Sequence, residues 1–247
     1  MNKIFQRFLQ RRNREKDKLE GKEYVPQEEY YFFMKQLKRW LVETQSKEDK
    51  IRLLDFVIDI VKRDLQVDLL TEIFYKEEFK ITNLTRSDFI PMDYIHKNGK
   101  QFFLQPESEN RIVDLNTVVT IVIPFKSRRM KEALLGIKNK GFRYDSTNHS
   151  PALYFKELDL CYALQGNHSL ASGIFQSTGE IQAKEYSIEP LFQNVRTDGL
   201  YWLNVHTNKP LKWSYRNKGR EVFDFRVAVL YELVRKKYHL NKMGGSI

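Results

Sequence analysis

Residues 151–169 read PALYFKELDLCYALQGNHS, and the fold expected for the chain follows from this stretch. Its apolar runs, 152–156 and 160–165, predict two strands, and Glu157-Leu158-Asp159 between them predicts a turn. If the two strands pair antiparallel, the hairpin brings its first residues back beside its last ones. Polar residues that flank the hairpin are therefore expected to meet at its open end.

The tripeptide Asn-His-Ser stands on both sides of this hairpin, at 148–150 and 167–169. Two of the five histidines, His149 and His168, are therefore expected to share a pocket, where an imidazole can supply a hydrogen bond or a proton. They are the candidate catalytic residues. No metal site is predicted, because two histidines with only Asp145 nearby offer too few ligands.

A helix is expected directly after the second strand, over 169–180. Gly166 permits a sharp exit from the strand, and Ser169 is expected to cap the helix. The N–H groups of the first helical turn, beginning with Leu170, would then have no partner inside the helix, which suits a phosphate or a carboxylate. The alternative is that these polar residues only cap the helix. The predicted phosphate-binding residues at this point are Gly166, Asn167, Ser169 and Leu170.

The segments around the hairpin predict an α+β fold. Residues 26–80 have apolar side chains at helical spacing, beginning at Pro26. The other expected elements are a hairpin at Asn98-Gly99, a buried strand over 116–125, a helix over 127–142 capped by Ser127, strands over 181–188 and 199–207, and a long helix over 221–240. The chain is thus expected to have an N-terminal helical region, 1–100, and an α/β domain with a C-terminal helical extension, 101–247.

The composition indicates a folded, basic protein. The net charge is +10, and apolar residues make up 41% of the chain, which is typical of a globular domain whose positive field attracts polyanions. The single cysteine, Cys161, excludes an internal disulfide. Without an apolar run of membrane-spanning length or a secretory signal, the chain is expected to be cytoplasmic, with no integral membrane association. Residues 1–22 have the spacing of a basic amphipathic helix.

A second basic region lies near the C-terminus. It mixes cations with aromatic side chains, as phosphate contacts and base stacking require. The alternative is a solvated loop whose tryptophan packs on the core. The predicted nucleic-acid-binding residues are Lys209, Lys212, Trp213, Tyr215, Arg216, Lys218 and Arg220.

The order strand, helix, hairpin, glycine-histidine box, helix and closing strand over about 116–190 resembles the ParB/sulfiredoxin superfamily. In this resemblance Gly166 matches the box glycine and His168 the box histidine. Ser169 stands where an arginine that contacts phosphate is usual, so Arg128 or Arg129 of the preceding helix is expected to replace it. Asn167 stands where sulfiredoxin carries its reactive cysteine, so reductase activity is not expected.

The resemblance implies a small mixed sheet with helices that binds nucleotide or nucleic-acid phosphates at the box. It also implies an NTP-dependent enzyme, a switch or a nuclease in bacterial DNA maintenance or phage defence, with Mg²⁺ accompanying a nucleoside triphosphate. Whether the chain is a nucleotide hydrolase, a nuclease or no enzyme stays open. The alternatives are a non-catalytic nucleic-acid-binding protein and a protein-interaction module, in which the helical N-terminal region forms a homodimer.

Overall fold

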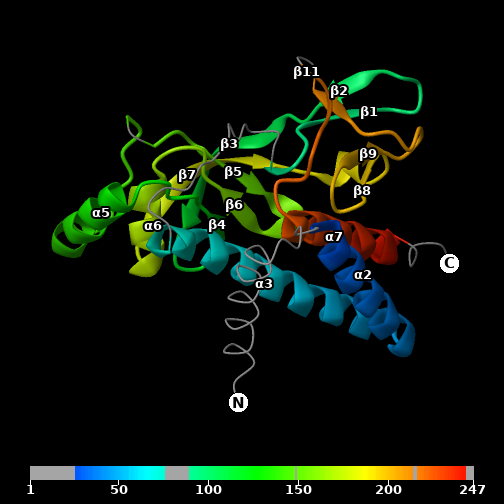
Figure 1. Ribbon diagram of the computed structural model, residues 1–247, viewed down its shortest axis with the longest axis horizontal. Coiled ribbons are helices and arrows are strands. Elements are labelled where there is room, and N and C mark those ends of the chain that lie inside the picture. Colours follow the sequence, from blue (N-terminus) through cyan, green and yellow to red (C-terminus); the bar gives the residue numbers. More distant parts are fainter. Residues whose placement is uncertain (1–25, 76–88, 148, 214–215, 243–247) are drawn as a thin grey trace, which may run out of the picture.

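The computed structural model describes residues 26–75, 89–147, 149–213 and 216–242 (Figure 1). It confirms the predicted α+β class: helices pack against a mixed sheet, and a long helix, α7 (Phe225–Lys242), ends the described chain. The amphipathic segment predicted over 1–22 and the predicted binding residue Tyr215 lie outside the described residues. None of the helices in the described ranges is both long enough and apolar enough to cross a membrane.

The main sheet of the described chain has five strands in the order β3-β7-β5-β6-β4. Its strands are β3 (Pro106–Asp114), β4 (Val119–Ile121), β5 (Ala152–Phe155), β6 (Leu160–Tyr162) and β7 (Glu180–Tyr186). As predicted, β5 and β6 form an antiparallel hairpin, which pairs Tyr154 with Cys161. The short 3-10 helix η2 (Lys156–Leu158) and Asp159, with a φ of 45°, make the turn. β4 runs parallel to β6 and β7 parallel to β5, so the sheet is mixed.

The two faces of this sheet belong to two separate clusters of buried side chains. Alternate residues of a strand point to opposite faces. Leu153 and Phe155 of β5 accordingly join the larger cluster with the N- and C-terminal helices, whereas Tyr154 joins the smaller cluster on the other face. Cys161 is fully buried in the smaller cluster, and burial raises the pKa of its thiol to about 12. This cysteine is therefore a packing residue.

Helices α2 (Pro26–Glu43) and α3 (Lys47–Thr71) begin as their sequences predict. Pro26 is the first residue of α2, and the Ser46 hydroxyl caps α3 by accepting a hydrogen bond from the Asp49 N–H at 2.9 Å. Both helices pack against α7, and α3 also packs against β4. The helices of the predicted N-terminal region therefore share one hydrophobic core with the predicted C-terminal domain.

A cluster of charges joins α3 to the start of α7. The Arg226 guanidinium lies 2.6 Å from a carboxylate oxygen of Asp68, 2.7 Å from Asp224 and 3.5 Å from Asp64. Burial by itself lowers the pKa of Arg226, but the bonds and charges of Asp224 and Asp64 outweigh burial and raise it. The arginine therefore stays charged, and its carboxylate partners hold the two helices together.

The remaining strands form short hairpins outside the main sheet. The Asn98-Gly99 turn is confirmed, with Gly99 at a φ of 82° in the left-handed region. It joins β1 (Asp93–Ile95) to β2 (Gln101–Phe103). The other hairpins pair β8 (Val195–Thr197) with β9 (Trp202–Asn204) and β10 (Lys212–Trp213) with β11 (Arg216–Gly219). The strand expected over 199–207 is thus the three residues of β9.

Strand β3 was not predicted, because its sequence PESENRIVD is polar and most of its side chains are exposed. It is an edge strand that pairs with β7 over most of its length, so main-chain hydrogen bonds hold it, together with the Arg111–Glu185 ion pair and the buried Val113. The buried strand predicted over 116–125 is shorter than expected, because only Val119–Ile121 pairs with β6.

Candidate functional site

The β5–β6 hairpin brings the residues on its two sides to the start of helix α6 (Asn167–Phe175). His168 lies in the first turn of α6, and the His149 ring reaches the same turn from the other side of the hairpin, 2.7 Å from the Ser169 hydroxyl. The structure therefore places both histidines at this helix start. Each imidazole has different partners, and these partners decide what each ring can do.

The His149 imidazole is held on both nitrogens. The Asp145 N–H donates to Nδ1 at 3.0 Å, so the proton of the neutral ring is on Nε2, which donates to the Ser169 hydroxyl. That hydroxyl in turn donates to the Gly166 carbonyl at 2.9 Å. His149 is 6% exposed, and burial lowers the pKa of its imidazole despite the opposing charge of Asp145. His149 is thus a neutral side chain that joins the Asp145 loop to α6.

Gly166 is required at the entry to α6 for two reasons. Its φ of 71° lies in the left-handed region, and a Cβ atom there would lie 2.1 Å from Cδ2 of His149. Gly166 rather than Ser169 is the N-cap residue of α6, so the helix begins earlier than predicted. As a result the Leu170 N–H donates to the Gly166 carbonyl at 3.0 Å and is not the free donor that was expected.

His168 is bound to the segment that precedes helix α5 (Ser127–Lys140). Its Nε2 accepts a hydrogen bond from the Lys126 N–H at 3.1 Å, so Nδ1 carries the proton of the neutral ring. The ring packs edge-on against Phe125, with centroids 4.8 Å apart. Burial lowers the pKa of His168, and the positive charges of Arg129 and Lys126 lower it further. A neutral imidazole here can offer its Nδ1 proton to an anion.

Asn167 makes a second link between these two segments. Its side-chain oxygen accepts a hydrogen bond from the Ile123 N–H at 3.0 Å. Together with the His168 bond, this contact places the first residues of α5 beside those of α6, and the two helices pack on each other. The N–H groups of Asn167, His168 and Ser169 have no acceptor among the described residues. They are therefore the donors that this helix start presents.

The first turns of α5 and α6 differ electrostatically from those of the N-terminal helices. Glu28 and Glu29 lie in the first turn of α2, and α3 also begins with acids, whereas neither α5 nor α6 has one. Acids are the favoured residues near the positive end of a helix dipole. The exposed cations Arg128 and Arg129 stand there in α5 instead, so positive charge accumulates where the two helices begin. Arg128 points outward to Glu132, whereas the charge of Arg129 acts on His168.

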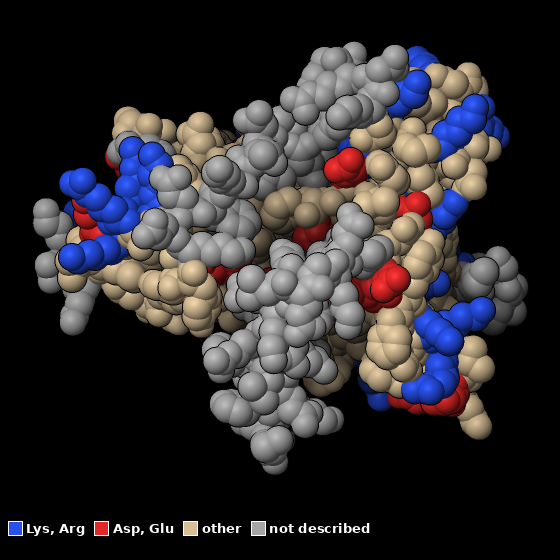
Figure 2. All heavy atoms as spheres, in the orientation of Figure 1, with Lys and Arg blue, Asp and Glu red and all other residues tan. Residues whose placement is uncertain are grey.

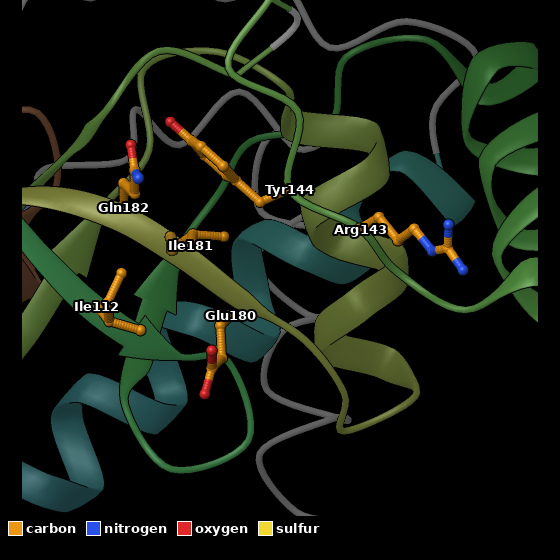
Figure 3. Close-up of a pocket in the computed structure, with 6 residues that line it drawn as sticks. All are labelled: Ile112, Arg143, Tyr144, Glu180, Ile181 and Gln182. Atoms are coloured by element: carbon orange, nitrogen blue, oxygen red, sulfur yellow. The ribbon is translucent and has the colours of Figure 1, made fainter.

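We call the place where α5 and α6 begin side by side the junction. A hollow of about 460 Å³ lies near the junction but does not coincide with it. Its lining residues are Ile112, Arg143, Tyr144, Glu180, Ile181 and Gln182 (Figure 3). In Figure 3 the Arg143 and Glu180 side chains point away from each other, so no charged groups converge in it. Tyr144 connects the hollow to the site, because its hydroxyl donates to the His149 carbonyl at 2.9 Å. Nowhere in the described ranges do three His, Cys, Asp or Glu side chains gather as metal ligands would.

Three of the predicted nucleic-acid-binding residues near the C-terminus, Lys209, Lys212 and Arg220, have side chains that the structure describes. Lys209 and Lys212 are exposed. Arg220 is 3% exposed, and its guanidinium lies 2.7 Å from the Asp93 carboxylate, so its charge is paired inside the fold rather than presented to a ligand. The backbones of Trp213, Arg216 and Lys218 lie on strands β10 and β11.

Lys126 is the residue of the junction that the sequence did not predict. It is exposed, it is the N-cap residue of α5, and its N–H binds His168. The only signal was its position immediately before the predicted helix, because the contact with His168 joins residues 42 positions apart.

Comparisons with curated proteins and with solved structures found no match. A family model described as DUF6710, a family of unknown function, matches residues 8–243. Because this match spans almost the entire chain, the protein belongs to the DUF6710 family.

Proposed function

We propose that the protein binds phosphate groups of a nucleotide or nucleic acid where α5 and α6 begin. The observation that carries the proposal is the hydrogen bond from the Lys126 N–H to His168, which places two helix N-termini side by side. Each N-terminus carries a partial positive charge and unpaired N–H groups. Arg129 and Lys126 add full charges at the same point, and a phosphate is the common ligand of such a site.

The residues of the junction have separate roles in this proposal. The His168 Nδ1–H and the first N–H groups of α6 donate to phosphate oxygens, and Arg129 takes the place of the arginine absent from position 169. His149 is a positioning residue, because both of its nitrogens are engaged within the protein. These contacts favour phosphate binding over acid–base chemistry at His149.

The ParB/sulfiredoxin-like resemblance supports the same ligand class. The elements on which the resemblance was based follow each other along the chain: strand β4, helix α5, the β5–β6 hairpin, helix α6 and strand β7. A Mg²⁺ ion accompanying a triphosphate would be bound chiefly by phosphate oxygens and water.

Calorimetric titration of the full chain with ATP, CTP, GTP, pyrophosphate and a short DNA duplex tests the proposal. At least one of these ligands should bind, and Arg129→Ala and His168→Ala should each weaken that binding by roughly tenfold, because each removes a donor to phosphate. Arg39→Ala, which removes an exposed arginine of α2, is the control and should bind like the wild type. Absence of heat with every ligand, or equal binding by all three variants, would contradict a site at this junction.

A further inference from the structure

Helix α5 and its flanking residues carry an excess of positive charge. Residues 126–143 contain seven Lys or Arg and a single acid, Glu132, in a protein whose net charge is +10. In Figure 1 α5 lies at the left edge of the molecule, and Figure 2 shows Lys and Arg side chains gathered there. The exposed cations of this region, which we call the α5 surface, are Lys126, Arg128, Arg129, Lys131 and Arg143.

The charge extends along the helix rather than being confined to its start. Arg128 and Lys131 stand in its first half, and the exposed Arg143 follows three residues after its last residue. The 14 residues of α5 span about 21 Å. That length matches about six steps of one strand of a double helix, whereas a single nucleotide would cover only one end. The α5 surface therefore fits an extended polyanion.

The apolar face of α5 is already occupied. Met130 is 1% exposed and Ile137 is 9% exposed, and Met130 lies in the smaller buried cluster with residues of α6. An amphipathic helix that lies in a lipid surface buries its apolar face there. Leu135 is the large apolar side chain that α5 exposes, which is too little for insertion. These observations favour a nucleic acid over an anionic membrane as the polyanion.

The aromatic side chains that lie beside the α5 surface in the sequence are not placed for base stacking. Phe125, Phe142 and Tyr144 are all partly buried, and the rings of Phe125 and Tyr144 pack against His168 and His149. Proteins that bind single strands stack bases on exposed aromatic rings. Cations without such rings suit the phosphate backbone of a duplex, which carries a high density of charge independent of sequence.

We infer that the α5 surface binds the phosphate backbone of double-helical nucleic acid. This inference rests on the proposed function, because one phosphate of the duplex is taken as the ligand of the junction. The adjacent phosphates of the same strand would then lie along α5. DNA and RNA duplexes share the required chemistry.

Binding of the full chain to DNA and RNA duplexes of roughly 20 base pairs, measured by fluorescence anisotropy over a range of salt concentrations, tests the inference. The double variant Arg128→Glu/Lys131→Glu should bind at least one duplex about tenfold or more weakly, with a salt dependence shallower by roughly two in the log–log slope. Lys38→Glu/Arg39→Glu is the matched control: it makes the same charge change on exposed residues of α2 and also breaks an i,i+4 ion pair, Arg39–Glu43, as the test variant breaks Arg128–Glu132. The control should keep more of the duplex affinity than the test variant.

Three outcomes would overturn the inference. They are equal losses of duplex affinity in the two double variants, binding to phosphatidylserine vesicles without binding to a duplex, and loss of duplex binding in Lys209→Glu/Lys212→Glu instead of the α5 variant.

ATP binding separates this inference from the proposed function. If ATP binds in a way that depends on Arg129 and neither duplex binds, the proposed phosphate site at the junction is supported and duplex binding by the α5 surface is contradicted. If a duplex binds through Arg128 and Lys131 but Arg129→Ala and His168→Ala do not weaken the binding of any ligand, the proposed phosphate site at the junction is contradicted.

Discussion

At the scale of single residues, the two histidines that look equivalent in the sequence have different roles. Both stand in an Asn-His-Ser tripeptide, yet His149 is held by Asp145 and Ser169, whereas His168 contacts the segment before α5. The hairpin pattern was sufficient to predict that both would reach one place. The partners of each ring could not be predicted, because they depend on where the Asp145 loop and Lys126 lie in space.

Burial of His149 predicts a dependence of stability on pH. The pKa of an unfolded histidine is about 6.5, and burial lowers the pKa of His149 in the folded protein. As the pH falls below about 6.5, the unfolded chain takes up this proton first, so the free energy of unfolding decreases. The variant His149→Gln should lose this part of the decrease and, at neutral pH, should be about 1–3 kcal/mol less stable because buried hydrogen bonds are lost.

Urea unfolding of both proteins at neutral and mildly acidic pH checks this prediction. His168 and His239 also have lowered pKa values owing to burial, so the variant should retain a shallower pH dependence rather than none. An equally steep loss of stability in acid in both proteins would show that the buried His149 ring does not contribute.

At the scale of elements, helix α5 was predicted nearly to its ends, although its sequence is not optimised for stability. Arg128 and Arg129 stand at the positive end of the helix, and Gly136 stands in its interior. The space that a Gly136 Cβ would enter is open, so packing does not explain this glycine. The β5–β6 hairpin and α6 were also predicted, because the residues that turn the chain, Lys156–Leu158 with Asp159 in the hairpin and Gly166 before α6, lie next to these elements in the sequence.

The variant Gly136→Ala should therefore stabilise the protein by about 0.5–1 kcal/mol, since alanine is the better helix former. Gly141→Ala is the contrasting variant at the end of the same helix. The φ of Gly141 is 71°, so alanine there is strained and should destabilise by about 1–2 kcal/mol, although no atom lies in its way. Chemical denaturation measures both changes. If both variants shifted stability in the same direction, local backbone conformation would not explain these glycines.

At the scale of the whole molecule, helices far apart in the sequence enclose one core, and this arrangement leaves apolar side chains exposed on α2 and α3. Phe32 is 66% exposed on α2, and Phe56 and Val67 are 67% and 56% exposed on α3. α2 and α3 contain 18 and 25 residues. With a rise of about 1.5 Å per residue and a width of about 10 Å, their outer faces together measure roughly 650 Å². This area is close to the roughly 800 Å² that each partner contributes to a standard interface. A second copy of the chain, paired through the same faces, is the predicted occupant.

Light scattering over a range of protein concentrations checks this prediction. The wild type should form dimers, and Phe56→Asp/Val67→Asp should shift the equilibrium to monomers, because a charge in a buried interface is costly. Phe103→Asp alters an equally exposed aromatic residue on β2 and should leave the dimer intact. A monomeric wild type at every concentration would contradict the predicted homodimer.

The sequence by itself determined the elements whose signals are local: the helices with apolar periodicity, the Asn98-Gly99 turn and the β5–β6 hairpin. It also determined that two histidines would meet at a helix start. Such signals suffice because the turn residues and the apolar spacing act within a few positions of each other.

Only the tertiary structure decided what depends on partners distant in the chain. Strand β3 exists because β7 pairs with it, and Arg220 is buried because Asp93 lies opposite. Helix α6 begins before Ser169, the predicted cap, because its N-cap residue is Gly166, which packs against the distant His149. Hydrogen bonds and charges of this kind form between residues that the fold brings together, so no pattern of neighbouring residues could specify them.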